Sequence, residues 1–320
     1  MAERVTLVEM APRDGLQNEP VSIETAQKIR LVDLLSACGF QRIEVASFVS
    51  PKWVPQMADG AAVLAGIERR PGTRYAALTP NLKGYAAAKA AAVDEVAIFG
   101  SASEGFSRAN INCSISESLE RFMPIATAAL ADSMPMRGYV SCVTDCPYDG
   151  PVAPSSVARV AERLYRAGCY EISLGDTIGR GTPERVDAML AAVLQAVPAE
   201  ALAGHFHDTN GQALDNIAVG LARGLRVFDA AAGGLGGCPY AAGTAGNVAT
   251  EAVTAMLEAE GFETGIDRAS LAEAAGFARA LRSGVEAPAR PQRSDRVEPP
   301  LAVPHVTDRQ AAPKPAKSGQ

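Results

Sequence analysis

The stretch YEISLGDTIGRGTPERVDAMLAAVLQAVPAEALAGHFHD, residues 170–208, contains the unit from which the rest of the chain is built. It begins with a short apolar run at 170–176, continues through an alanine-rich segment at 182–196 and ends in a second apolar run at 202–208. The two short runs are typical of buried strands, and the longer segment between them has the length of a helix. A strand, a helix and a second strand in this order predict two parallel neighbours in one sheet.

The same alternation extends in both directions from this unit, and it accounts for the chain from residue 4 to residue 259. The predicted strands cover 4–10, 42–48, 74–79, 95–100, 136–143, 170–176, 202–208 and 226–232. The predicted helices cover 24–39, 54–69, 81–91, 115–131, 154–167, 182–196, 211–223 and 247–259. One more helix is predicted at 267–282, after the last of these units.

Eight strand–helix units in roughly 250 residues predict the α/β class, as a (β/α)8 TIM barrel. Helix 267–282 is then an extra C-terminal helix outside the barrel. The alternative is an open doubly wound sheet, in which a glycine-rich phosphate turn is expected after the first strand. The first strand leads instead into APRDGLQNE, residues 11–19, which favours the barrel.

The composition changes at Ser283. Seven of the 21 prolines lie between this residue and the end of the chain, where apolar periodicity is lost. Such a segment cannot bury enough apolar surface to order itself. The sequence therefore predicts a catalytic TIM-barrel domain over 1–282 and a proline-rich disordered tail over 283–320.

Charge and cysteine usage limit the partners and the compartment. The net charge of −6 gives no electrostatic footprint for nucleic acid or for an anionic membrane. No apolar run reaches the ~18 residues needed to cross a bilayer, and the start, MAERVTLVEMAP, enters a strand without a secretory signal. The six scattered cysteines resemble core residues rather than a disulfide framework. We expect a cytoplasmic protein that binds neither nucleic acid nor membrane.

Two of the three histidines lie in HFHDTN, residues 205–210. Side chains two apart in a strand point to the same face, so His205 and His207 are expected to enter the barrel near its C-terminal mouth. Barrel active sites lie at that mouth. Two hydrogen-bonded histidines that merely line the barrel are the alternative interpretation.

The ends of other predicted strands supply oxygen ligands. Asp14 follows the first strand, Asn247 opens the segment after the eighth, and Glu44 lies inside the second. Two imidazoles, one carboxylate and an amide oxygen predict a mixed nitrogen–oxygen site for Mg²⁺ or Mn²⁺, and Zn²⁺ stays open. Asp176 is expected either to support the site or to cap a helix or form a turn. Asp208 is expected to cap the next helix rather than to bind the metal.

The loop after the eighth strand is AAGGLGGCPYAAGTAGNVATE, residues 231–251, with six glycines around one cysteine. So many glycines make a loop costly to order, which favours closure over a ligand rather than a purely structural connection. Cys238 is therefore a candidate proton donor or nucleophile. The other five cysteines are interpreted as buried core residues.

In chain order, PRDGLQNE, SFVSPKWVPQMAD, SLGDTIGRGTP, HFHDTNGQALDNI and GGLGGCPYAAGTAGNVATE resemble the hydroxymethylglutaryl-CoA lyase family. The resemblance extends from about residue 5 to residue 282, and it departs at Pro20, where many members carry a lysine. It implies a TIM barrel, a homodimer, an acyl-CoA substrate and a role in leucine degradation. The residues that it implies are Asp14, His205, His207 and Asn247 as ligands of Mg²⁺ or Mn²⁺, Arg13 as catalytic cation, Cys238 as catalytic thiol, and Glu44 and Glu251 as site carboxylates.

The implied reaction is a retro-Claisen cleavage of 3-hydroxy-3-methylglutaryl-CoA to acetoacetate and acetyl-CoA. It needs a cation that acidifies the tertiary hydroxyl, a guanidinium beside the enolate oxygen and an acid that protonates the enolate carbon. Asp14, a histidine or a water could remove the hydroxyl proton. Three alternatives remain: a lyase for a larger 3-hydroxy-3-alkylglutaryl-CoA, a related Claisen-type synthase or aldolase, and a non-enzymatic barrel that binds a partner.

Overall fold

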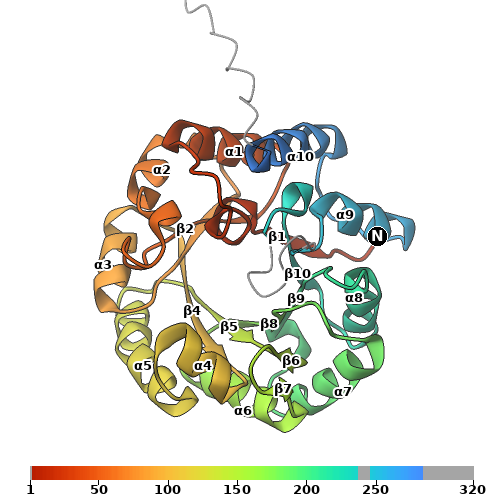
Figure 1. Ribbon diagram of the computed structural model, residues 1–320. Helices are drawn as coiled ribbons and strands as arrows, with labels where there is room; N and C mark the ends of the chain where they lie inside the picture. The colour runs from red at the N-terminus through yellow and green to blue at the C-terminus, as the bar shows by residue number, and fades with distance from the viewer. Residues whose placement is uncertain (1, 237–245, 284–320) are drawn as a thin grey trace, which may run out of the picture. The chain divides into compact units, whose positions relative to one another are not determined.

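The structure, a computed structural model, describes residues 2–236 and 246–283. Among these residues, eight parallel strands close into a barrel in the order β1-β10-β9-β8-β5-β4-β3-β2, with helices around it (Figure 1). The predicted (β/α)8 barrel is confirmed, and the open sheet is wrong because β1 pairs with both β2 and β10. The barrel strands are β1 (Thr6–Glu9), β2 (Arg42–Ser47), β3 (Arg74–Leu78), β4 (Glu95–Ser101), β5 (Met136–Ser141), β8 (Glu171–Asp176), β9 (Leu202–Phe206) and β10 (Val227–Ala230).

The strands read as apolar runs because both of their faces are covered. All six residues of β2 are buried, as are all five of β9. Side chains fill the inside of the barrel, and helices cover its outside, which is the arrangement that parallel strands require. The helices that follow the barrel strands are α1 (Thr25–Ala37), α2 (Gly60–Gly66), α3 (Leu82–Ala90), α5 (Ile115–Ala131), α6 (Pro154–Arg166), α7 (Pro183–Val193), α8 (Ala213–Ala222) and α9 (Thr250–Ala259).

The helix predicted at 54–69 is shorter than expected. A 3₁₀ turn, η2 (Pro55–Met57), comes first, and the α-helix begins only at Gly60. The buried ammonium of Lys28 in α1 donates to the Gln56 carbonyl and to the Asp59 carboxylate. These bonds engage the Gln56 carbonyl and the Asp59 carboxylate, and they hold the segment before Gly60 against α1.

Two further elements on the mouth side were not predicted. Helix α4 (Glu104–Ile111) follows β4, and a small hairpin of β6 (Asp145–Cys146) and β7 (Gly150–Pro151) follows β5 (Figure 1). Ser103 caps α4, since its side chain accepts from the backbone N–H of Phe106. Neither element has the length or the periodicity that would reveal it in the sequence.

The extra C-terminal helix is confirmed as α10 (Arg268–Arg282), which packs beside α1 on the outside of the barrel (Figure 1). The guanidinium of Arg30 lies 4.6 Å from the ring centroid of Phe277, and the Asp267 N–H donates to the Cys38 carbonyl at 2.8 Å. The predicted tail, apart from Ser283, lies outside the described residues.

Of the helices that the structure describes, none combines the length and apolar character that a membrane span requires. The five cysteines in the described ranges are unpaired thiols, and all are buried, as predicted. They are Cys38, Cys113, Cys142, Cys146 and Cys169.

Candidate functional site

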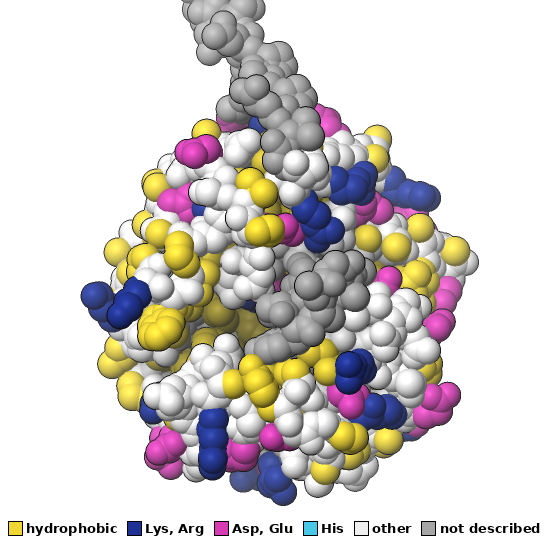
Figure 2. Space-filling view, viewed as in Figure 1, with side chains coloured by type: hydrophobic (Ala, Val, Ile, Leu, Met, Phe, Trp, Pro, Cys, Tyr) yellow, Lys and Arg dark blue, Asp and Glu magenta, His cyan; other side chains and the backbone are white. Residues whose placement is uncertain are grey.

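The carboxyl ends of the barrel strands open onto a cavity of about 280 Å³. Its wall has a polar part, which includes Arg13, Asp14, His205 and His207, and an apolar part. The apolar part includes Val49, Val54, Leu78, Phe99, Phe106 and Ile111. Figure 2 shows a hollow on this face with hydrophobic side chains along its wall. The site thus offers both a charged end and an apolar surface.

Arg13 and Asp14 lie in a single π-helical turn, η1 (Ala11–Gly15), directly after β1. The buried carboxylate of Glu9 fixes the start of this turn, because it accepts from the N–H groups of Ala11 at 2.8 Å and Ala232 at 2.9 Å. Burial raises the pKa of Glu9 to about 7, against the opposing effect of these backbone donors. The sequence did not predict the π-turn, which brings two adjacent charged residues to the mouth.

Asp14, His205 and His207 form a compact cluster. Each offers a ligand atom, and these atoms all lie within 4.8 Å of one another. The Nε2 of His205 is 3.9 Å from the Oδ2 of Asp14. Burial raises the pKa of Asp14, but Arg13 and the two histidines outweigh burial and lower it to about 2. The cluster therefore presents an ionised carboxylate beside two imidazoles.

The protonation of His207 suits a metal ligand. Burial, reinforced by the neighbouring His205, lowers the pKa of His207 to about 4, so its imidazole is neutral at pH 7. Its Nδ1 is buried and has no hydrogen-bond partner within the described ranges. A buried polar atom without a partner is costly. A divalent cation bound by the cluster would engage a histidine in the neutral form that ligation requires.

Asn247 reaches the cluster from the far end of the barrel domain. A backbone bridge joins it to His207, and its Nδ2 donates to the Oδ2 of Asp14 at 2.8 Å and to the Leu235 carbonyl at 3.2 Å. Asn247 thus lies beside the cluster, with its amide nitrogen directed at Asp14. To ligate a cation, the amide would have to turn and present its oxygen.

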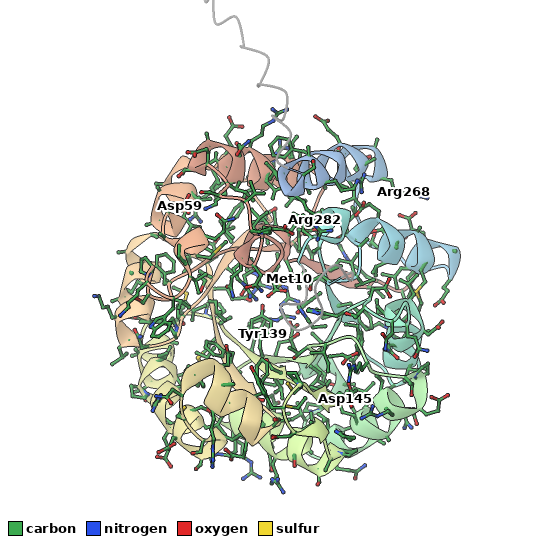
Figure 3. All side chains as sticks on the ribbon, viewed as in Figure 1. Met10, Asp59, Tyr139, Asp145, Arg268 and Arg282 are labelled. Atoms are coloured by element: carbon green, nitrogen blue, oxygen red, sulfur yellow. The ribbon has the colours of Figure 1, made fainter. Side chains whose placement is uncertain are left out.

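Arg13 is held from two sides. Its Nε donates to the Oε2 of Glu44 and its Nη1 to the Oδ1 of Asp14 at 2.6 Å. Tyr139, which lies inside the ring of strands in Figure 3, donates to the other oxygen of Glu44 at 3.1 Å. Burial by itself would lower the pKa of Arg13, but the two carboxylates raise it above its ordinary value. The guanidinium is a permanent cation with a fixed orientation at the cavity wall.

The sequence interpretation missed the groups that contact His205 from inside the barrel. The Nδ1 of His205 lies 3.1 Å from the Oδ2 of Asp229, and both oxygens of Asp229 accept from Arg137, at 3.1 and 2.7 Å. Arg137 is in β5 and Asp229 in β10, and both are buried. A charged residue inside an otherwise apolar buried strand was the available signal, since such residues are rarely buried without a partner.

The other carboxylates near the site have structural partners. Asp176 accepts from the Thr144 hydroxyl and from the Gly181 N–H, each at 2.7 Å, so it shapes a turn. Asp208 accepts from the first N–H of α8 at 3.0 Å, in agreement with its predicted capping role. Glu251 accepts from the Gly233 N–H and from Arg279, each at 2.8 Å, and it is not part of the cluster of Asp14 and the two histidines.

Cys238 lies outside the described residues, as does the segment 237–245 around it. The described glycines on either side of this segment are both at the mouth. The Gly246 carbonyl accepts from the Asp208 N–H at 2.7 Å. At Gly236, where φ is +104°, an added Cβ would lie 2.6 Å from the Asn247 Nδ2. The described residues on either side of 237–245 therefore lie beside Asn247 and Asp208.

Comparisons with known proteins agree on one family. The sequence model of the HMGL-like family matches residues 4–277. A Pseudomonas aeruginosa protein named 3-hydroxy-3-isohexenylglutaryl-CoA/hydroxy-methylglutaryl-CoA lyase is 58% identical over 274 residues, which are 86% of this chain and 91% of that protein.

Two solved structures are similar to the barrel. The HMG-CoA lyase of Brucella melitensis has a TM-score of 0.88 and 62% identity, and the match covers 88% of this chain and all of the other. An HMG-CoA lyase from Acinetobacter baumannii, in complex with coenzyme A and 3-methylmalate, has a TM-score of 0.83 and 36% identity, with 94% and 98% covered.

Proposed function

The chain belongs to the HMGL-like family, and we propose that it cleaves 3-hydroxy-3-methylglutaryl-CoA into acetoacetate and acetyl-CoA. It is a carbon–carbon lyase and not a synthase or a binding module. The observation that carries the proposal is the meeting of two charged groups at one cavity. The Asp14–His205–His207 cluster and Arg13 share its polar wall, an ion pair joins Arg13 to Asp14, and the buried Glu44 forms a second ion pair with Arg13.

A divalent cation, Mg²⁺ or Mn²⁺, is part of the proposal. Asp14, His205 and His207 would hold it, with Asn247 as a fourth ligand once its amide is turned. The neutral His207, with its unpartnered Nδ1, supports this assignment. When bound, such a cation acidifies a coordinated hydroxyl and fixes its orientation.

Arg13 stabilises the negative charge that develops when the carbon–carbon bond breaks. A guanidinium carries five N–H donors in a rigid plane. In Arg13, Glu44 engages the Nε donor and Asp14 engages one donor on Nη1, so other donors remain for a substrate oxygen. The pair of carboxylates keeps the group in place before substrate arrives. A preorganised cation of this kind stabilises an enolate oxygen without reorganisation during the reaction.

Cys238 is proposed as the acid that protonates the enolate carbon of the acetyl-CoA product. Its position in the sequence supports the role, since Gly236 and Gly246, the described residues on either side of its segment, lie at the mouth. A thiol loses its proton near pH 8.5 in an unperturbed setting, which suits donation to a carbanion at neutral pH. Glu44 is proposed to act through Arg13, whose orientation it sets.

A homodimer and a role in leucine degradation are also proposed, because the family resemblance implies them. A cytoplasmic location is proposed because the described cysteines are unpaired. The acyl-CoA substrate has further support, because the related A. baumannii enzyme was solved with coenzyme A. We also propose that the catalytic domain ends at residue 282, before the proline-rich segment.

A second candidate substrate is a larger 3-hydroxy-3-alkylglutaryl-CoA. The 58%-identical relative carries both substrate names, and the cavity has an apolar wall that includes Leu78, Phe99 and Ile111. A longer 3-alkyl group would be expected to lie along this wall, because burial of each methylene contributes about 0.8 kcal/mol.

The test is a coupled assay for acetyl-CoA release from a panel of 3-hydroxy-3-alkylglutaryl-CoA thioesters, with Mn²⁺ and with a chelator. We expect release from the methyl substrate that stops when the chelator is added and returns with Mn²⁺. A protein that binds Mn²⁺ but releases acetyl-CoA from none of the thioesters would contradict the proposed function. The rates on methyl and longer-chain substrates decide between the two candidates.

A further inference from the structure

A buried network of charged residues lies inside the barrel and contacts His205. Arg137 and Asp229, whose side chains are 1% and 0% exposed, are its central ion pair. Burying two charges is costly, and a buried ion pair can often be replaced by apolar residues without loss of stability. The pair is therefore poorly explained as a stabilising device alone, and its contact with a proposed metal ligand offers a second explanation.

The contacts of Asp229 determine which nitrogen of His205 carries a proton. The neighbouring strands place the two residues opposite each other in register, and the Oδ2 of Asp229 lies 3.1 Å from Nδ1. The same oxygen accepts from the Ser173 hydroxyl at 2.8 Å. An ionised carboxylate can only accept hydrogen bonds, so His205 must donate from Nδ1. In the neutral ring, Nε2 then carries the lone pair, and Nε2 is the atom 3.9 Å from Asp14.

Arg137 prevents Asp229 from turning. Its Nη1 and Nη2 bind the two oxygens of Asp229 as a fork, at 3.1 and 2.7 Å. Its Nε donates to Glu171 at 2.7 Å, and Glu171 in turn accepts from both terminal nitrogens of Arg42, at 2.8 and 3.0 Å. The arginine is thus anchored on its other side by a second ion pair. A bidentate pair of this kind fixes the plane of the carboxylate as well as its position.

We propose that Arg137 and Asp229 are positioning residues that hold His205 as its Nδ1–H tautomer, with Nε2 directed at Asp14, and thereby set the affinity of the cluster for a divalent cation. This inference rests on the metal site of the proposed function. Its first consequence, the tautomer, concerns the metal-free protein and does not depend on catalysis. Carboxylates that orient metal-binding histidines typically change metal affinity roughly 10- to 100-fold when they are altered.

The informative variant is Asp229→Asn, which keeps the size of the side chain. The amide has one oxygen, and the Arg137 fork, which has only donors, requires that oxygen. The NH₂ group is then left facing His205, where it donates to Nδ1 and moves the ring proton to Nε2. We expect the opposite tautomer and a roughly 10- to 100-fold weaker affinity for Mn²⁺. Ser173→Ala is the matched control, since it removes another hydrogen bond to the same oxygen while the Arg137 fork stays.

Two measurements test the inference on the full-length protein. NMR of ¹⁵N-histidine-labelled protein without metal reads the tautomer directly, and with three histidines in the chain the signals can be assigned from His207→Gln and His305→Gln. Calorimetric titration with Mn²⁺ reads the affinity. We expect Nδ1–H in the wild type and in Ser173→Ala, Nε2–H in Asp229→Asn, and weak Mn²⁺ binding only in Asp229→Asn.

A wild-type His205 whose Nδ1 carries no proton would overturn the inference, even if Asp229→Asn does not fold. Unchanged Mn²⁺ affinity in a folded Asp229→Asn would also overturn it. Arg137→Lys, which keeps the charge but loses the fork, is expected to weaken Mn²⁺ binding in the same direction. If the wild type binds Mn²⁺ but cleaves no thioester, the proposed function fails while these results still decide the positioning role.

Discussion

The Arg13→Lys variant keeps a positive charge at the cavity wall but removes the fork that orients it. In the protein, Nε of Arg13 binds Glu44 and Nη1 binds Asp14 at 2.6 Å. A lysine ammonium is a compact point charge on a flexible stem, and it lacks the planar set of donors. We expect the ammonium to settle between Glu44 and Asp14. The enolate oxygen then loses its preorganised donor.

The expected loss follows from this geometry. Removing one preorganised donor from a developing oxyanion costs about 2.7–4 kcal/mol of transition-state stabilisation, or roughly 10²- to 10³-fold in kcat. Arg13 is only 6% exposed, so water is a poor replacement for the lost contact. KM should change less than kcat, because the negative charge develops only in the transition state.

The assay is acetyl-CoA release at saturating Mn²⁺, with bound metal measured on the same samples. Arg223→Lys is the control, because Arg223 binds Asp187 as a similar fork, at 2.6 and 2.7 Å, but lies on the outer helices. It should leave kcat unchanged. A kcat for Arg13→Lys within threefold of the wild type, at equal metal content, would refute the argument for a fixed guanidinium.

Four further predictions concern the cluster and the loop. Cys238→Ala should lower turnover strongly and leave metal content intact, as measured by elemental analysis beside the assay; loss of metal would instead indicate a ligand. His207→Ala should lose metal and activity together, and full metal occupancy at a normal rate would show that the ligand assignment is wrong. The pKa of His207 is about 4 in the folded, metal-free protein and 6.5 when unperturbed, so the unfolded chain takes up a proton between these values that the folded chain does not. The free energy of unfolding of the wild type relative to His207→Gln should therefore fall by up to about 3 kcal/mol as the pH drops from 6.5 to 4, and a constant difference in denaturant titrations would contradict the buried neutral imidazole. Gly236→Ala should weaken Mn²⁺ binding because its Cβ would lie 2.6 Å from the Asn247 amide, whereas Gly261→Ala, with φ also positive but nothing within 4 Å, should retain normal affinity.

Local sequence patterns were sufficient for the barrel and for much of the proposed site. The alternation of side chains in the predicted strand 202–208 placed His205 and His207 on one side, and the rule that active sites lie at the ends of barrel strands placed Asp14 near them. These inferences need only the period of a strand and the common direction of all strands in the barrel. The end of each predicted element was less certain, because Lys28 and other tertiary contacts decide where the segment 54–69 becomes helical.

The supporting network could not be predicted in the same way. Arg137 and Asp229 are 92 residues apart, and nothing local to either strand indicates that they meet. Each looks like an interruption in an apolar run until the register of the closed barrel is known. The π-turn at Ala11–Gly15 has a similar origin, since Glu9 fixes it through the distant Ala232 N–H.

The hydrogen bond between Asp14 and Asn247 joins residues 233 positions apart, across the seam where β1 meets β10. A cation held there would join the segment after β1 to the segment after β10, much as a cross-link does. It would therefore favour the closed barrel over any chain in which β10 has not yet been added. On a ribosome, the early histidine-free half of the chain emerges long before its ligand partners are synthesised. The ion could then bind with all of its ligands only after Asn247 has been synthesised and the barrel has closed.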